Sequence, residues 1–451
     1  MEIHSTGGSR RELFRLAWPI FLEVVLFSVI GSVDVMMLAG FSDNAVGAVG
    51  VANQIVSLFQ VLCSIVTTGT GILCAQYIGA GRGIKEKQPL ILAALLVNGA
   101  LGVLFSVAIG AGADLLLTMM KVEDALRIHG HQYLTIVGSC LFLQTISMTF
   151  SVLIRSHGKT RATMVFSVLM NVMNMILNYL LIYGKLGLPR MGAAGAAVAT
   201  VTSQAMSCVL GGIYLFWKVL PGMSFKPQWR PMGRSMRQIL AYGSPAAGEQ
   251  ISYTLSKLVV MAMVTSLGTV AVNTYSYVNI VTGYVYLFSV ALGQGTSIIV
   301  GWNVGKQDLD GAYSLGRFSA RCSFLIAMVA VGIVCLLRRQ IMGLFTKDEA
   351  IIAMGASVIL ADLLLDAGRS RNLVLVGSLR AAGDVRFPLY IGLFSMWAFS
   401  VGVSWILGIG LGWGLVGIWI GLGLDECFRA VGMQIRWRTG VWKRYATAKA
   451  Q

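Results

Sequence analysis

Long apolar segments alternate with short polar connections along the whole chain. Runs of roughly 20 or more predominantly apolar residues recur from one end to the other, each long enough to cross a hydrocarbon core about 30 Å thick. The alternating short strands of an outer-membrane barrel are not found in the sequence, so helices are the remaining way to satisfy backbone hydrogen bonds in lipid. The pattern predicts an all-α membrane protein.

We expect twelve transmembrane helices arranged as two pseudo-symmetric lobes of six. The expected spans are, approximately, 12–40, 45–78, 89–113, 125–154, 162–184, 192–217, 237–266, 270–303, 314–337, 350–380, 387–409 and 413–435. Only 12% of the residues are charged and 56% are hydrophobic, whereas a soluble domain carries about twice that charge. Every connection is short, which excludes a receptor or a membrane-tethered enzyme with a cytosolic head.

The basic residues give the topology. The net charge of +16 could indicate nucleic-acid binding, but the lysines and arginines punctuate the apolar segments instead of forming one face or tail. Alternate connections sort by charge, with 24 lysines and arginines on one side and 6 on the other. By the positive-inside rule both termini are cytoplasmic, in the inner (plasma) membrane of a bacterium. We therefore expect the lipid bilayer, and no nucleic acid, as the surrounding partner.

The sequence contains no motif typical of an enzyme or an ATP-driven pump. It has no HExxH motif and no phosphate-binding loop, and its seven cysteines are scattered without paired spacing. The prediction is a protein that is not an enzyme and needs no cofactor, no disulfide and no firmly bound metal. No cleavable signal is recognised before the first apolar segment.

The two halves of the chain repeat one another. Pro19 and Glu23 match Pro245 and Glu249 at an offset of 226, and Arg155 matches Arg380 at an offset of 225. We expect an N-lobe at 1–217, a cytoplasmic linker at 218–236 and a C-lobe at 237–451. Because six spans per half preserve orientation, the repeats are parallel, and two lobes around a shared interior suit alternating access.

Several motifs resemble the multidrug and toxic compound extrusion (MATE) transporters. They are VDVMMLAG at 33–40, AQYIGAG at 75–81, SLRAAGD at 378–384, and the segment NYLLIYGKLGLPRMGAAGAAVAT of the fifth and sixth spans. The resemblance implies secondary-active efflux of cationic or amphipathic organic molecules, driven by protons or sodium, with alternating access. The alternative is a lipid-linked saccharide flippase of the same superfamily. We expect a monomer that acts on small organic substrates.

Asp34 is the first candidate for the residue that couples transport to a cation. A carboxylate inside a span is costly and functional by default, and its repeat counterpart is Val260. The resemblance places Asp34 at the family's acidic position and directs the polar side chains of Asn174 and Asn178 toward it, with Thr200 as a further oxygen. Some members have a second aspartate where this chain has Asn178, so a sodium site at Asp34 has one fewer negative charge here. For each asparagine, an interhelical hydrogen bond without a ligand is the alternative.

Two further groups of charged residues are candidates for a substrate cavity. Glu23 and Glu249 are repeat equivalents, so both could instead lock the helix bundle; Glu249 is also spaced to pair with Lys257, with Tyr253 as a bridge. The tenth span has Asp362 and Asp366 one turn apart and Arg369 one turn beyond. These charges either neutralise one another, as Asp366 with Arg369, or line a wet cavity that binds a cation or an anion.

Overall fold

A computed structural model describes residues 10–447, and in this part of the chain all regular elements are helical. The first half contains α1 (Arg10–Ala39), α2 (Asp43–Gly79), α3 (Ile84–Met119), α4 (Asp124–Ser139), α5 (Leu141–Ser156), α6 (Thr160–Tyr183), α7 (Gly192–Tyr214) and the π-helix η1 (Leu215–Val219). The second half contains α8 (Trp229–Ser266), α9 (Thr269–Val285), α10 (Leu287–Gly305), α11 (Leu309–Leu336), α12 (Arg338–Phe345), α13 (Glu349–Ala381), α14 (Arg386–Ser395), the π-helices η2 (Met396–Val403) and η3 (Ile406–Gly410), α15 (Gly414–Arg438) and α16 (Lys443–Thr447).

Twelve long helical segments correspond to the twelve expected spans. Within the described residues nine helices are long and apolar enough to cross a membrane, and α4 with α5 makes a tenth across a bend of 49°. The two remaining segments, α8 and α15, are long helices with internal charges. The charges that lower the apolar character of α15 are buried against other helices, so they do not face lipid.

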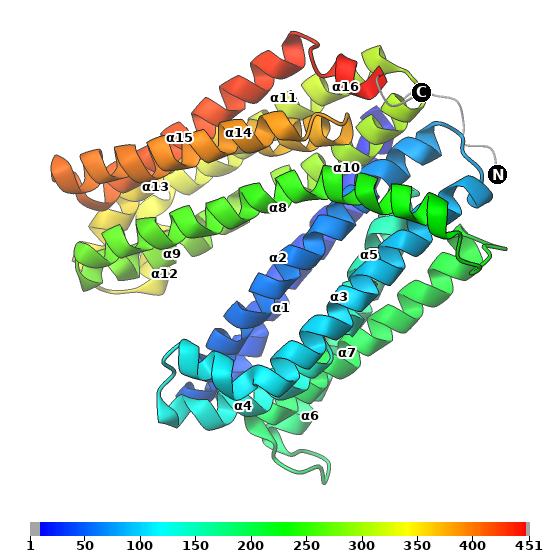
Figure 1. Cartoon of the computed structure of the whole chain (residues 1–451). Coiled ribbons are helices and arrows are strands. Elements are labelled where there is room, and N and C mark those ends of the chain that lie inside the picture. The colour runs from blue at the N-terminus through cyan, green and yellow to red at the C-terminus, as the bar shows by residue number, and fades with distance from the viewer. Residues whose placement is uncertain (1–9, 448–451) are drawn as a thin grey trace. The chain divides into compact units, whose positions relative to one another are not determined.

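The chain forms two compact units, which we call the N-unit and the C-unit. The N-unit consists of Leu22–Ile78 and Arg82–Ser244. Among the described residues, the C-unit consists of 10–21, Gly79–Gly81 and 245–447. In the N-unit α3, α5, α6 and α7 pack side by side, and α4 lies against α3 and α7 (Figure 1). In the C-unit α13 is central, since it packs against α9, α10, α11 and α15.

Two helices contribute to both units. Helix α1 belongs to the C-unit up to Phe21 and to the N-unit from Leu22, while α8 changes unit between Ser244 and Pro245. Each change lies at or near a repeat-equivalent proline, Pro19 or Pro245. A proline inside a helix removes one backbone hydrogen bond and weakens the helix locally. The two repeat-equivalent prolines thus mark the places where α1 and α8 pass from one unit to the other.

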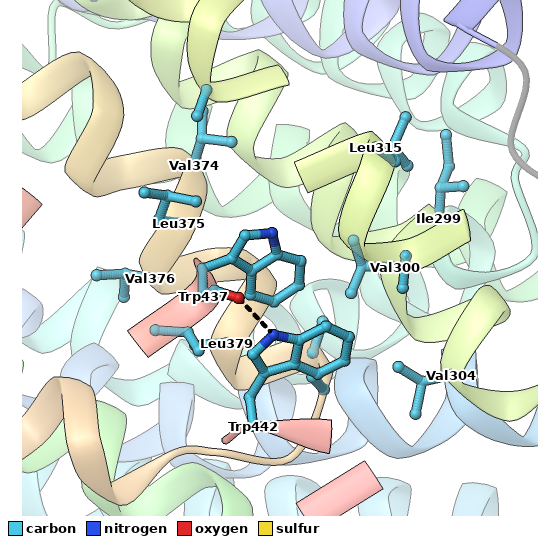
Figure 2. Packing of buried hydrophobic residues seen from close by; sticks show 14 of the residues in the cluster. Ile299, Val300, Val304, Leu315, Val374, Leu375, Val376, Leu379, Trp437 and Trp442 are labelled. Carbon is cyan, nitrogen blue, oxygen red and sulfur yellow. Dashed lines mark hydrogen bonds between the residues drawn. The ribbon is translucent and has the colours of Figure 1, made fainter. Parts of the chain in front are cut away.

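A stacked pair of tryptophans closes the C-unit core at its carboxyl-terminal end. The rings of Trp437 and Trp442 lie 4.3 Å apart and almost parallel, and Trp442 Nε1 donates a hydrogen bond of 3.0 Å to the Trp437 carbonyl oxygen (Figure 2). Trp437 Nε1 donates to the carbonyl oxygen of Tyr313 in α11. Leu13 and Leu16 of α1 are buried in the same apolar cluster. The start of α1 and the segment after α15 are therefore held by one core.

Candidate functional site

Three helices of the N-unit bring a polar cluster together inside an apolar bundle. Helix α1 supplies Asp34, α6 supplies Asn174 and Asn178, and α7 supplies Thr200. Asn178 Nδ2 donates hydrogen bonds of 2.9 Å to Asp34 Oδ1 and 3.1 Å to Asn174 Oδ1. Asn174 Nδ2 lies 3.5 Å from Thr200 Oγ1. Asp34 and the three residues expected around its carboxylate thus form one connected set of contacts.

Local geometry explains how α6 and α7 present these groups. Asn174 and Asn178 are four residues apart, which places them one above the other on a single helix face. Helix α6 ends at Gly184 in a left-handed conformation with φ of 68°, a backbone region that glycine occupies without strain. The chain then returns so closely that a Cβ on Gly195 would lie 2.8 Å from Leu181 backbone atoms. Small residues therefore let α7 lie against α6 and bring Thr200 to the asparagines.

Tyr133 and Asn53 extend the cluster, and neither was predicted as a site residue from the sequence. The Tyr133 hydroxyl donates to Asn53 Oδ1 at 3.3 Å and also interacts with the Thr200 side chain. Tyr133 is only 5% exposed. No sequence signal indicated that α4 packs against α7.

The carboxylate of this cluster has no counterpart in the C-unit. Val260, the repeat equivalent of Asp34, is fully buried in an apolar cluster of α8, α9, α11, α13 and α15. Asp34 is half-buried, whereas Asn174 and Asn178 are 8% and 3% exposed. Carboxylate, amide and hydroxyl oxygens are the ligands that hard cations prefer, and a carboxylate also accepts a proton. The cluster has the chemistry for either ion.

Glu23 and Glu249 form equivalent ion pairs in the two units. In the N-unit Arg155 donates to Glu23 Oε1 at 2.6 Å, and Ser167 Oγ donates to the same oxygen at 2.6 Å. In the C-unit Arg380 donates to Glu249 Oε2. The two glutamates and the two arginines occupy matching repeat positions. Because the ion pair is present in both halves, it supports the interpretation that these glutamates hold the helices of each unit together.

The expected pairing of Glu249 with Lys257 is wrong. Lys257 Nζ lies over the ring of Tyr253, 5.4 Å from its centroid, and forms no ion pair within the described residues. Glu249 instead contacts Arg380 and, at 3.9 Å, Arg429 Nη1. Lys257 is two turns from Glu249 on the same helix, whereas Arg380 of α13 and Arg429 of α15 are the residues that contact the carboxylate. Tyr253 and Lys257 remain together, as a cation–π contact.

The aspartates of the tenth span belong to a buried charged network between α13 and α15. Asp362 and Asp366 are fully buried; Asp362 Oδ1 accepts a hydrogen bond of 2.9 Å from Trp419 Nε1. Arg369 lies 3.8 Å from Asp366 Oδ1 and 4.0 Å from Glu426 Oε1, and its guanidinium stacks over the Tyr286 ring. The spacing of Asp366 and Arg369 therefore does place them in contact.

Helix α15 supplies half of this network, although its residues were not among the predicted site residues. Arg429 donates to Asp425 Oδ2 and to Glu426 Oε1, both at 2.9 Å. Asn372 Nδ2 donates to Glu426 Oε2 at 2.8 Å. The signal was present in the sequence, since LDECFRA at 424–430 puts three charges into an apolar span.

A π-helix positions two hydroxyls on Asp425. Ser395, the last residue of α14, donates to Asp425 Oδ1, and Ser400 in η2 donates to Asp425 Oδ2 at 2.9 Å. Residues five apart share a face in a π-helix, which has i→i+5 hydrogen bonds. Asp425 is thereby held by two hydroxyls and one arginine.

Acids outnumber bases in the C-unit network. The acids are Glu249, Asp362, Asp366, Asp425 and Glu426, and the bases are Lys257, Arg369, Arg380 and Arg429. Asp362 and Asp366 also interact with each other through their carboxyl groups. Two adjacent buried carboxylates repel each other, so the loss of one of the two charges relieves this repulsion. Within the described residues no group of three histidine, cysteine or acidic side chains has the geometry of a metal site.

Comparison with known proteins supports the repeat and the fold. The MatE family model matches twice, at residues 19–180 and 245–406, so the two matches begin 226 residues apart. The chain is 36% identical to the transporter YisQ of Bacillus subtilis over 430 residues, covering 95% of this chain and 94% of YisQ. It is 26% identical to a probable multidrug resistance protein NorM of Thermotoga maritima, covering 97% and 94%.

A solved structure has the same fold. A point mutant of the Vibrio cholerae MATE transporter VcmN superposes with a TM-score of 0.88 at 15% sequence identity, covering 96% of each chain. The expected class, an all-α membrane protein of twelve transmembrane helices in two pseudo-symmetric lobes, is confirmed.

Proposed function

This chain belongs to the MATE family of multidrug transporters, and we propose that it exports organic, often cationic or amphipathic, compounds in exchange for protons or sodium ions. The observation that carries the coupling step is the contact of Asp34 with Asn178. It joins α1 to α6 through a carboxylate that only one of the two repeats has. The proposed antiport uses this asymmetry, because ion binding at Asp34 changes the packing of one unit alone.

The oxygens around Asp34 support binding of either coupling ion. A sodium ion would take the carboxylate together with amide and hydroxyl oxygens from Asn174, Asn178 and Thr200. A proton would bind Asp34 itself and give its carboxyl group an O–H donor beside the remaining acceptor oxygen. Either ion would weaken the hydrogen bond that Asn178 donates to Asp34. The ion then biases α1 relative to α6, which is the local change that alternating access requires.

The C-unit network favours organic cations over a lipid-linked saccharide as substrate. A flippase for an anionic lipid-linked sugar would need unpaired cations toward its cavity. Arg369 is balanced by Asp366 and Glu426, and Arg371 lies over the ring of Phe324 at 3.7 Å. With five acids against four bases, this network has no cationic surplus. This balance leaves the network no net positive charge with which to bind an anionic lipid-linked sugar.

The remaining elements of the proposal follow the charge pattern and the repeat. The two lobes, at 1–217 and 237–451, are joined by a cytoplasmic linker at 218–236. Their movement opens a shared interior to either side of the inner membrane in turn. Both termini are cytoplasmic, and the working form is a monomer. Neither an enzyme activity nor a cofactor is part of the mechanism.

Export by an Asp34→Asn variant tests the proposal. Purified protein is reconstituted in liposomes, the membrane potential is clamped, and efflux of the fluorescent organic cation ethidium is followed while the sodium and pH gradients are varied separately. We expect wild-type protein to respond to one of the two gradients. In Asp34→Asn we expect the response to fall about tenfold or more, because a neutral amide binds neither ion as a carboxylate does.

Asp43→Asn is the matched control. Asp43 is an exposed acid at the start of α2 in the same unit, so its loss changes the charge without touching the cluster. Gradient-driven efflux by Asp34→Asn at the wild-type rate, with equal protein in the liposomes, would refute the assignment. If the wild-type protein responds to neither gradient with a panel of organic cations, the antiport itself is wrong.

A further inference from the structure

An apolar groove lies along the outside of the N-unit, between α3 and the start of α8. Its volume is about 480 Å³. The lining residues are Ala93, Leu96, Val97, Ala100, Leu101, Leu104, Trp229, Met232, Gly233 and Met236. Leu96, Leu104 and Trp229 are 51%, 61% and 73% exposed. The groove is thus open to its surroundings and separate from the polar cluster at Asp34.

The length of the groove corresponds to one leaflet of a bilayer. The lining residues of α3 extend from Ala93 to Leu104, which at 1.5 Å per residue is about 16 Å. The hydrocarbon of one leaflet is about 15 Å deep. In a membrane-spanning protein, one acyl chain has the length and the apolar character to fill an open groove of this kind. Length alone, however, does not select one lipid over another.

A row of exposed arginines lies beside the groove. On α8 the groove-lining residues Trp229, Gly233 and Met236 are each followed directly by an exposed arginine. These arginines are Arg230, Arg234 and Arg237. The spacings of four and three keep them on one face of the helix, beside the face that lines the groove. Within the described residues none of the three forms an ion pair with a carboxylate, and Lys226 is a further exposed cation before the helix.

We propose that this groove is a binding site for an anionic phospholipid, with one acyl chain between α3 and α8 and the phosphate against Arg230 and Arg234. With both termini cytoplasmic, the arginines lie on the cytoplasmic side. From Trp229 onward the proposed linker at 218–236 is already part of helix α8 and enters the inner leaflet, so the lipid comes from that leaflet. Trp229, at the mouth of the groove, is the residue type that membrane interfaces favour. The site is independent of which ion or drug the protein transports.

Native mass spectrometry of the full-length protein in detergent tests the proposal without any transport assay. The probes are phosphatidylglycerol and phosphatidylcholine with identical chains, which separate the head group from the acyl chain. We expect wild-type protein to bind phosphatidylglycerol more tightly. In Arg230→Gln/Arg234→Gln the phosphatidylglycerol affinity falls roughly 30-fold, since each basic residue near an anionic head group contributes about a fivefold factor. Phosphatidylcholine binding changes little.

A second variant fills the groove. No atom lies within 4 Å of a Cβ built on Gly233, so Gly233→Trp places its ring in the open groove without disturbing the helix. We expect it to weaken both lipids. The matched controls are Arg161→Gln, which removes an exposed cation elsewhere in the N-unit, and Gly112→Trp, which adds the same bulk to α3 at a glycine that also has open space.

The remaining outcomes overturn the proposal. If wild-type protein binds the two lipids with equal affinity, the groove is not selective for an anionic lipid. If neither groove variant changes phosphatidylglycerol binding, the lipid does not bind in the groove. A dimer that dissociates in Gly233→Trp would show that a second copy occupies the groove. Displacement of phosphatidylglycerol by ethidium would assign the groove to the transported compound. Lipid binding and antiport are measured in separate assays. Failure of this proposal can therefore be told apart from failure of the proposed function.

Discussion

Arg155 donates a hydrogen bond of 2.6 Å to Glu23, a residue 132 positions away in the chain. The pair joins α1 to the end of α5, and the Glu23 side chain is only 12% exposed. Its repeat copy joins Glu249 of α8 to Arg380 at the end of α13. The copies differ in one respect, since only Glu249 has a second arginine, Arg429, at 3.9 Å among the described residues.

This difference predicts unequal costs for breaking the two pairs. Arg155→Met leaves Glu23 as a buried charge without its arginine, and we expect a loss of about 3 kcal/mol in the free energy of unfolding. Arg380→Met should cost clearly less, because Arg429 remains beside Glu249. Thermal unfolding in detergent measures both. In the double variant Glu23→Gln/Arg155→Met we expect partial recovery; no recovery would show that the pair's charge is unimportant.

The C-unit network predicts that its acids are not equivalent. Asp425 is held by Arg429, Ser395 and Ser400, so Asp425→Asn should cost about 2 kcal/mol through weakened hydrogen bonds, while Glu426 still pairs with Arg429. Asp366→Asn removes one of two carboxyls in contact, and the stability should stay within about 1 kcal/mol of wild type. The melting temperatures of the two variants, compared in one detergent, check this. A larger loss for Asp366→Asn than for Asp425→Asn would show that repulsion between Asp362 and Asp366 is unimportant for stability.

His157 predicts a pH dependence of stability. This residue lies between α5 and α6, outside the membrane-spanning segments, with Nδ1 2.8 Å from the Leu153 carbonyl oxygen and Nε2 3.4 Å from Lys87 Nζ. Burial, assisted by the charge of Lys87, lowers the pKa of His157 to about 4. The pKa in the unfolded chain is about 6.5. Between these values the unfolded chain binds more protons, so the stabilising contribution is complete above about pH 6.5 and is lost as the pH falls toward 4.

A His157→Asn variant removes this dependence. Asparagine keeps a donor for the Leu153 carbonyl oxygen but does not titrate, so wild-type protein should lose up to about 3 kcal/mol more than the variant between about pH 6.5 and pH 4. Melting temperatures across this range measure the difference. His131→Asn serves as the control, because the His131 side chain is 44% exposed. Parallel curves for wild type and His157→Asn would contradict the prediction.

Two glycines of α8 predict opposite effects of the same substitution. A Cβ on Gly243 would lie 1.8 Å from the Ile65 carbonyl oxygen of α2, whereas a Cβ on Gly233 would meet open space. Gly243→Ala should therefore cost roughly 1–3 kcal/mol through overpacking. Gly233→Ala should be neutral or stabilising, because alanine favours helix more than glycine does. Equal melting temperatures would show that α8 does not cross α2 as closely as described.

The spans and the repeat could be predicted because hydropathy and a fixed offset are properties of the sequence alone. The contact of Asp34 with Asn178 followed from helix periodicity together with the family motif. The partner of Glu249 could not be predicted, because Lys257 on the same helix satisfied the spacing while Arg380 and Arg429 come from other helices. Tyr133 was missed for a similar reason, since its role depends on how α4 packs. Spacing along one helix shows which residues share a face, but which partner a side chain contacts depends on how the helices pack.

The stacked indoles of Trp437 and Trp442 have a practical consequence for anyone who expresses this protein. Shortening the chain to Gly440 would remove the fully buried ring of Trp442. The face of Trp437 and the neighbouring leucines would then be exposed to solvent. Purification tags and fluorescent reporters therefore belong beyond residue 447, with the preceding residues kept. Deletion libraries that trim this end would report loss of yield and say nothing about transport.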